Sequence, residues 1–219
     1  MAVIGIVGGT GKLGQALAGR WAKAGHEVLV GSRSMEGAQA TAGELSARLG
    51  KTIAAGTNLD VASRADIVVL TVPFAAQAER LDEIRDAVAG KIVIDTTVPL
   101  VPPKVMRVQL PAEGSAAMRA QAQLGEGVRL VSAFHNVAAH KLATDAAIAC
   151  DVLVFSDDRE ARNVGVGLAK DAGLRGLHGG ALANAAAAEA LTSVLIFLNK
   201  TYQVDGAGIR ITGELVEPA

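Results

Sequence analysis

The chain has 219 residues, a length between one and two typical domains, and 50% of its residues are hydrophobic. Aromatic residues make up only 3%, so the core must be built from Ala, Val, Leu and Ile. The formal net charge is -1, and the absence of a basic stripe or a lysine-rich tail argues against nucleic acid as a partner.

The N-terminus and the cysteine content indicate a soluble cytoplasmic protein. The chain opens with a strand-like segment at Val3–Val7 and lacks the basic and long apolar regions of a signal peptide. We expect no membrane contact, because no apolar stretch reaches the roughly 20 residues that span a bilayer. The Ala-rich run near residue 185 is interrupted by Asn184 and Glu189. Cys150, the single cysteine, is interpreted as a small buried hydrophobic residue.

Strand-like and helix-like segments alternate from the start of the chain. The predicted strands of this part are residues 3–7, 27–30, 52–55, 66–72 and 91–95. The predicted helices are residues 12–24, 36–49 and 77–88. Repeated βα units specify a parallel sheet with right-handed crossovers, and fully apolar runs such as 67–70 indicate strands covered on both faces. The sequence therefore predicts an α/β fold with a Rossmann-type doubly wound parallel sheet.

The alternation breaks after residue 95. Residues 96–111 hold four of the six prolines and predict a long ordered loop. The segments predicted beyond it are a helix at 113–124, strands at 129–134, 152–155 and 174–177, a long helix at 181–199 and a short extended stretch at 206–211. We divide the chain into a Rossmann domain at residues 1–150 and a small C-terminal lobe at residues 151–219.

A glycine-rich loop separates the first predicted strand from the first predicted helix. Gly9, Gly11 and Gly14 follow the pattern G-x-G-x-x-G. A bound pyrophosphate needs a tight turn, a close backbone and N–H donors at a helix N-terminus, and glycines at this spacing permit all three. Three glycines can also mark a simple turn, but the position between a strand and an amphipathic helix favours dinucleotide binding.

The end of the second predicted strand indicates which dinucleotide binds. NAD-specific sites place an Asp or Glu here to accept from the ribose 2′-hydroxyl, whereas this chain has Gly31, Ser32 and Arg33. A hydroxyl and a guanidinium bind a 2′-phosphate, which a carboxylate would repel. The alternative is a surface arginine beside a helix N-cap serine. We favour NADP(H).

Two more segments follow predicted strands, where the ligands of open α/β sheets collect. Val72 and Pro73 can form one wall of the cofactor site, although a proline can also simply end a strand. His135 could hydrogen-bond a ring carbonyl or a nicotinamide amide, and a loop-end histidine is the alternative. His140 lies near His135, but without a Cys or carboxylate cluster beside them we expect no metal site.

The sequence lacks the acid–base groups of an alcohol dehydrogenase. Tyr202 is the only tyrosine, so there is no Tyr-x-x-x-Lys pair, and too little chain follows the Rossmann part for a large helical catalytic domain. We therefore expect no catalytic acid or base. The second substrate should accept hydride without a demanding proton transfer, and a flavin-like redox cofactor meets that description.

Taken together, these segments resemble the NADPH-dependent coenzyme F420 reductases. The resemblance runs nearly end to end and is carried by residues 8–14, 30–33, 70–74, 131–135, 180–184 and 206–209. It implies hydride transfer between the nicotinamide C4 of NADP(H) and the C5 of the F420 ring, with the C-terminal lobe completing the deazaflavin cleft. It also implies a homodimer, and the small side chains of the helix at 181–199 would allow close packing.

The resemblance also implies roles for individual residues. Thr10, Gly11, Lys12 and Leu13 would contact the pyrophosphate, and Ser32 and Arg33 would bind the 2′-phosphate. Val72, Pro73 and Ala139 would contact the nicotinamide half. His135 would contact the deazaflavin. Catalysis would then consist mainly of positioning two rings face to face.

The chain departs from the family pattern in two places. The family commonly has a lysine shortly after the Ser-Arg pair, where this chain has residues 34–37 without a basic group. One charged hydrogen bond fewer costs roughly 1.5–3 kcal/mol, so we expect weaker discrimination against NADH. The family also tends to have His-Thr-Ile-Pro-Ala, whereas residues 135–139 lack the proline and include Asn136, which is expected to alter the cleft wall.

Two alternative functions remain open at this point. Asn136 and the missing proline favour an NADPH-dependent reductase of a flavin or of a small imine or enone. The lack of a catalytic acid or base also permits a non-catalytic NADP-sensing module.

Overall fold

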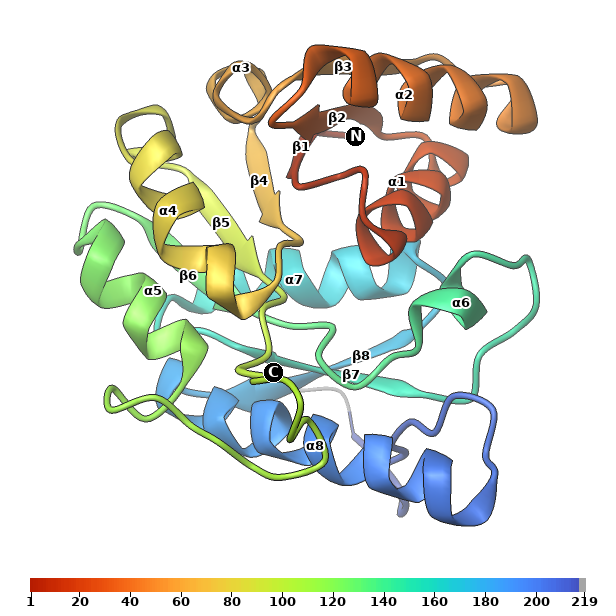
Figure 1. The fold of residues 1–219 in the computed structure, drawn as a ribbon, viewed down its shortest axis with the longest axis vertical. Helices are drawn as coiled ribbons and strands as arrows, with labels where there is room; N and C mark the ends of the chain where they lie inside the picture. The colour runs from red at the N-terminus through yellow and green to blue at the C-terminus, as the bar shows by residue number, and fades with distance from the viewer. Residues whose placement is uncertain (217–219) are drawn as a thin grey trace.

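The structure is a computed structural model that describes residues 1–216. Its centre is an eight-stranded sheet in the order β3-β2-β1-β4-β5-β6-β7-β8, with helices on both faces (Figure 1). The strands are β1 (Val3–Val7), β2 (Glu27–Ser32), β3 (Ile53–Thr57), β4 (Ile67–Leu70), β5 (Ile92–Asp95), β6 (Arg129–Ser132), β7 (Asp151–Phe155) and β8 (Arg175–Gly180). The predicted Rossmann-type fold is confirmed.

Eight α-helices and two short 3₁₀ turns connect the strands within the described residues. They are α1 (Lys12–Ala24), α2 (Met35–Leu49), α3 (Asn58–Arg64), α4 (Phe74–Ile84), η1 (Asp86–Val88), α5 (Ala116–Leu124), α6 (Ala139–Leu142), α7 (Arg159–Asp171), η2 (Leu182–Asn184) and α8 (Ala185–Tyr202). Helices α3, α6 and α7 were not predicted. Helix α7 buries Ala161, Gly165, Leu168 and Ala169, whose spacing follows the helical period, so the sequence carried a signal for this helix that the prediction missed.

The strand order places a topological switch point between β1 and β4. Strands β1 to β6 are all parallel, and the chain runs outward from β1 first through β2 and β3 and then through β4, β5 and β6. Strand β7 is antiparallel to β6, and β8 is parallel to β7. The chain after residue 150 therefore extends the same sheet by two strands. Residues 207–212 run beside β7, where the Asp151 amide donates to the Ile209 carbonyl at 2.8 Å.

Two apolar clusters fill the space between the sheet and its helices. One cluster packs α1, α2 and α7 on one face, and the other packs α3, α4, α5 and α8 on the opposite face. As the low aromatic content predicts, both clusters consist largely of Ala, Val, Leu and Ile. Cys150 is buried in the first cluster, which confirms its interpretation as a small hydrophobic residue.

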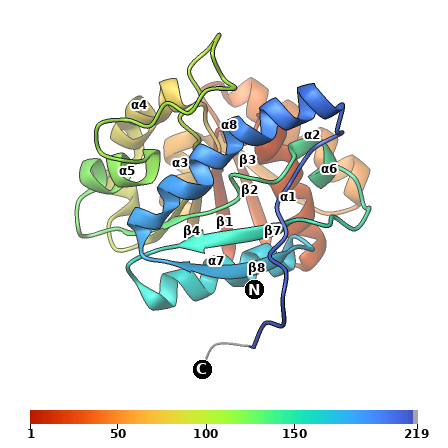
Figure 2. The ribbon, with the colours of Figure 1, turned by 90° about the horizontal axis from the view of Figure 1, so that it is seen from below.

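Helix α8 corrects the expectation about membrane-spanning length. Residues Leu182–Tyr202 form a 21-residue helical stretch with a mean hydropathy of 1.4, and 33% of its apolar window is buried. The stretch is therefore long and apolar enough to span a bilayer, by length and composition only. Many core helices of globular proteins meet the same criterion. Figure 2 shows α8 lying lengthwise across one side of the molecule.

Trp21 links the first cluster to the loop that follows β6. Its side chain is fully buried, its Nε1 donates to the Leu168 carbonyl at 2.9 Å, and its ring meets that of Phe134 edge-on at 5.8 Å. We predict that Trp21→Ala lowers the free energy of unfolding by about 3–5 kcal/mol, because it leaves a large cavity and removes the buried hydrogen bond from Nε1 to the Leu168 carbonyl. Urea denaturation measures this loss. Leu59→Ala on the exposed face of α3 is the control and should change stability by less than about 0.5 kcal/mol.

Candidate functional site

The segments predicted to bind ligands lie at one edge of the sheet. The last residues of neighbouring strands are in register, since Val7 pairs with Leu70, Leu70 with Asp95, and Asp95 with Ser132. The loops after β1, β4, β5 and β6 therefore leave the sheet side by side at its carboxyl edge. This edge flanks the switch point, where open α/β sheets bind their ligands.

The glycine loop between β1 and α1 has the geometry of a phosphate cradle. Gly8 has a φ of 73°, a left-handed conformation that favours glycine. A Cβ on Gly14 would lie 2.7 Å from the Cα of Gly9, so only a glycine allows α1 to pack this close to the loop. Gly11 is the N-cap of α1 and has no side chain to cap the first turn. The N–H groups of that turn are thus available to an anion, and the loop fits a pyrophosphate.

The end of β2 presents a hydroxyl and a guanidinium beside this loop. Ser34, rather than Ser32, is the N-cap of α2, and its Oγ accepts from the Gly37 amide at 3.3 Å. The Oγ of Ser32 accepts from the Ser34 amide at 3.3 Å, which leaves the Ser32 hydroxyl proton free for a ligand. Arg33 is exposed. Arg33 is thus an exposed arginine beside an N-cap serine, as the alternative describes, while the neighbouring Ser32 hydroxyl is not used as a cap.

One cavity of about 290 Å³ joins the glycine loop, the end of β2 and the start of α4. The predicted residues that line it are Thr10, Gly11, Ser32, Arg33, Val72 and Pro73. Pro73 is the N-cap of α4, so the helix starts at Phe74, three residues earlier than predicted. The predicted residues outside this lining are Gly9, Lys12, Leu13, His135 and Ala139.

Sequence reasoning missed several residues that line the same cavity. They are Gly8, Asn58, Thr71, Ala76, Glu79 and Arg80. The buried Asn58 fixes the glycine loop, because its Oδ1 accepts from the Gly8 amide at 3.1 Å. Thr57 caps α3 by accepting from the Asp60 amide. That Thr-x-x-Asp spacing is a helix-start signal that could have revealed α3 and the position of Asn58.

His135 lies at the same edge, after β6, and it is only 6% exposed. Its Nε2 is 2.9 Å from the Ser132 Oγ, and its buried Nδ1 has no hydrogen-bond partner among the described residues. Burial lowers the pKa of His135 to about 4, so the ring is neutral near pH 7. The preceding Phe134 has a φ of 67°, a strained conformation for an aromatic residue. His135 thus offers one uncommitted ring nitrogen from a constrained position.

Helix α8 holds the loop that carries His135. The Asn136 amide nitrogen donates to the Ala188 carbonyl at 2.8 Å and to the Thr192 hydroxyl at 3.1 Å. The Thr192 hydroxyl in turn donates to the His135 carbonyl at 3.0 Å. The sequence predicted that Asn136 alters the cleft wall, whereas the structure uses its buried amide to anchor the loop to α8. The residue that motivated a different second substrate therefore has a structural role.

Two buried carboxyl groups, Asp95 and Glu189, form hydrogen bonds that fix the helices packed next to this edge. Asp95, at the end of β5, accepts from the Thr97 amide at 2.9 Å and from the Gln77 amide nitrogen at 2.6 Å. Glu189 of α8 accepts from the Ala116 amide at 2.6 Å, at the start of α5. Burial raises the pKa of Asp95 to about 6, and burial together with the Asp95 charge raises the pKa of Glu189 to about 7. These groups tie α5 and α8 to the sheet.

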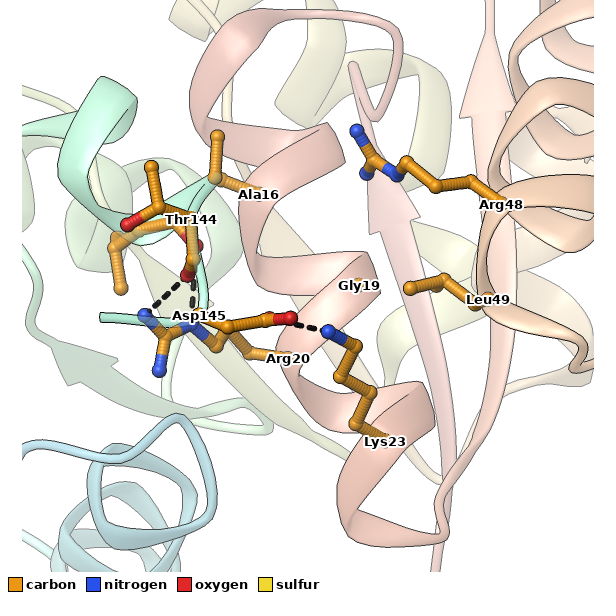
Figure 3. Close-up of a pocket in the computed structure, with 10 residues that line it drawn as sticks. Ala16, Gly19, Arg20, Lys23, Arg48, Leu49, Thr144 and Asp145 are labelled. Atoms are coloured by element: carbon orange, nitrogen blue, oxygen red, sulfur yellow. Dashed lines mark hydrogen bonds and ion pairs between the residues drawn. The ribbon is translucent and has the colours of Figure 1, made fainter. Parts of the chain in front are cut away.

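A second cavity, of about 210 Å³, lies between α1, α2 and the segment after α6 (Figure 3). Arg20 of α1 donates through Nε to the Leu142 carbonyl at 3.0 Å and through Nη2 to the Thr144 carbonyl at 2.6 Å. Lys23 forms an ion pair with Asp145. Because these contacts bind α1 to the chain just after α6, the cavity marks the junction that positions Ala139, the first residue of α6.

Comparison with known proteins identifies the family. Residues 3–99 match the family described as NADP oxidoreductase, coenzyme F420-dependent. The F420-dependent NADP reductase of Methanothermobacter thermautotrophicus is 44% identical over 218 residues, which cover 95% of this chain and 94% of that protein. This chain belongs to the F420-dependent NADP reductase family.

A further relative agrees with this assignment, and a solved structure shares the fold. The F420-dependent NADP reductase of Methanothermobacter marburgensis is 38% identical over 95% of this chain and 97% of its own length. A solved structure from Arthrobacter sp. FB24 superimposes with a TM-score of 0.82 at 23% identity, covering 97% of this chain and 100% of that chain. At that identity the structural match shows the shared fold.

The buried carboxyl groups predict a stability that falls as the pH rises. The pKa of Glu189 is raised from 4.5 to about 7, so its contribution is complete below about pH 4.5 and is lost as the pH passes about 7. We predict that the stability of Glu189→Gln, which cannot ionise, rises by about 2–3 kcal/mol relative to that of the native chain between pH 5 and pH 8. Urea denaturation across this range measures the difference. The exposed Glu44→Gln should follow the native chain, and a pH-independent effect of Glu189→Gln would contradict the prediction.

Proposed function

We propose that this chain is an oxidoreductase that transfers hydride between NADP(H) and coenzyme F420. The observation that carries the proposal is the carboxyl edge of the sheet, where the glycine loop, the end of β2 and the start of α4 line one cavity. His135 lies at the same edge with an uncommitted ring nitrogen. The family membership of the chain supports the same pair of redox partners.

The residues of the edge divide the binding of NADP(H) among themselves. The glycine loop, from Gly9 to Leu13, holds the pyrophosphate through the N–H groups of the first turn of α1, whereas the Gly9 and Gly11 amides donate to backbone carbonyls and fix the shape of the loop. Ser32 and Arg33 bind the 2′-phosphate through a free hydroxyl proton and an exposed guanidinium. Val72 and Pro73 wall the nicotinamide half, and Ala139 approaches it from α6.

The second substrate lies on the side of β5 and β6. When both ligands are bound, NADPH supplies a hydride that F420 accepts at C5. His135 orients the deazaflavin ring through a hydrogen bond from Nδ1, and its neutral imidazole excludes a role as a charged proton donor. The chain accelerates the reaction by holding two planar rings in reacting geometry, because a well-oriented pair needs no further activation by an acid or base.

The two parts of the chain on either side of residue 150 bind different ligands. In this proposal residues 1–150 bind NADP(H), and residues 151–219 form the lobe that completes the deazaflavin cleft. The support comes from α8, whose Thr192 and Ala188 bond to His135 and Asn136. Since β7 and β8 continue the central sheet, this lobe is joined rigidly to the first part of the chain.

We further propose a cytoplasmic homodimer built on α8 and the loop beside it. Ser193 of α8 donates to the Arg107 carbonyl, so the proline-rich loop and the helix lie side by side (Figure 2). Both present exposed apolar side chains, namely Val101, Met106, Val108 and Leu110 on the loop and Val194, Phe197 and Tyr202 on the helix. Exposed apolar side chains on two elements that touch are typical of protein interfaces, and a second copy of the chain would cover them in both subunits at once.

Anaerobic stopped-flow absorbance tests the hydride transfer. We expect rapid bleaching of the deazaflavin band when the purified chain meets NADPH and oxidised F420. If a flavin, imine or enone oxidises NADPH and F420 is not bleached, F420 is not the second substrate and that acceptor takes its place. Tight NADPH binding without turnover on any acceptor would indicate the NADP-sensing module instead.

Mass measurement in solution tests the dimer. The native chain should have twice the mass of one chain at micromolar concentration, and Phe197→Glu should convert it to a monomer by burying a charge at the interface. Leu59→Glu is the matched control, because Leu59 is about as exposed as Phe197 but lies on α3. A monomeric native chain, or a dimer that both variants retain, would contradict the proposed interface.

A further inference from the structure

We propose that Arg80 is the second cation that binds the 2′-phosphate of NADP(H), beside Arg33. The inference rests on the proposed function, in which the cavity at the carboxyl edge holds NADP(H). Arg33 follows β2 and Arg80 belongs to α4, yet both side chains line this one cavity together with Ser32. The tertiary structure thus brings the Arg80 guanidinium to the cavity where Arg33 is proposed to bind the 2′-phosphate.

The charge of the ligand calls for two cations. A phosphate monoester carries about -1.5 to -2 charges at pH 7, and one guanidinium balances only part of it. The segment that follows Arg33 contributes Glu36 and no basic residue to the first turn of α2. Among the described residues that line the cavity, the charged side chains are Arg33, Arg80 and Glu79. Arg80 is therefore the available source of the second positive charge.

The guanidinium of Arg80 has an unfilled hydrogen-bonding position. Arg80 is 8% exposed, and its Nη1 and Nη2 donate to Glu83 and Glu79. Its buried Nε has no partner among the described residues. Buried donors are rarely left unpaired, so this atom indicates an acceptor that arrives with a ligand. A phosphate oxygen suits the planar, forked donor set of arginine.

Glu79 provides the group that the phosphate would displace. Its side chain is 74% exposed and lines the cavity, whereas the Glu83 side chain is 28% exposed. Ion pairs at exposed carboxylates contribute little to stability, so the Glu79 contact can be exchanged at low cost. Glu83 would continue to hold Nη1 while the phosphate takes the place of Glu79. Glu79 therefore competes with the ligand for Arg80.

Calorimetric titration of the full chain with 2′,5′-ADP and with 5′-AMP isolates the 2′-phosphate. We expect Arg80→Gln to weaken 2′,5′-ADP binding about ten- to a hundred-fold and to change 5′-AMP binding less than about two-fold. Glu79→Gln should tighten 2′,5′-ADP binding about two- to five-fold, because it removes the competing carboxylate. Since Glu79 is exposed, this variant keeps the test valid even where Arg80→Gln folds poorly.

Two controls separate this inference from the proposed function. Arg85 lies just after α4, forms an ion pair with Asp82 and does not line the cavity. Arg85→Gln should therefore leave the affinities for 2′,5′-ADP and for 5′-AMP unchanged. Arg33→Gln should weaken 2′,5′-ADP selectively. If it does so while Arg80→Gln and Glu79→Gln have no selective effect, the role of Arg80 is overturned and the cofactor site stands. If the native chain does not prefer 2′,5′-ADP over 5′-AMP, both proposals fail.

Discussion

The arrangement of this molecule depends on the close approach of α1 to the loop that leaves β1. A Cβ at Gly14 would lie within 2.7 Å of the loop backbone, and Gly8 turns the chain with a left-handed conformation. These two glycines bring the N-terminus of α1 to the carboxyl edge of the sheet. The N–H groups and the positive end of the helix dipole then face the position where the loops after β2 and β4 converge. The other features of the NADP(H) site are built around that anchor.

Helix α8 fixes the loop after β6, which the proposed function assigns to the second ligand. It comes from the end of the chain, but it binds the His135 loop through Thr192 and Asn136 and binds the start of α5 through Glu189. The bonds from Asn136 to the Ala188 carbonyl and from the Ala116 amide to Glu189 are buried, so they are insulated from competing water. The loop after β6 is consequently held on both sides, by α8 and by the packing of Phe134 on Trp21. In the proposed function, this constraint fixes the position of the ring that His135 contacts.

The charged side chains described at the proposed site lie on the side that would bind the phosphates of NADP(H). In the proposed function, N–H groups of α1 bind the pyrophosphate and two arginines from separate elements bind the 2′-phosphate; Glu79 pairs with one of these arginines in the structure. At the opposite end the imidazole of His135 is neutral because it is buried. The chain thus concentrates charge where the ligand is charged and keeps the ring-binding side neutral, which suits hydride transfer between planar rings.

The sequence by itself determined the features that depend on local spacing. The strand–glycine loop–helix unit, the Ser32–Arg33 pair and the alternation of strands and helices are all visible because hydrophobic periodicity and glycine spacing are properties of short segments. The convergence of Asn58 and Arg80 on the cofactor cavity, the anchoring role of Asn136 and the buried pair of carboxyl groups were decided only by the tertiary structure. Each of these joins segments that are distant in sequence, and the packing of helices on the sheet determines which of them meet.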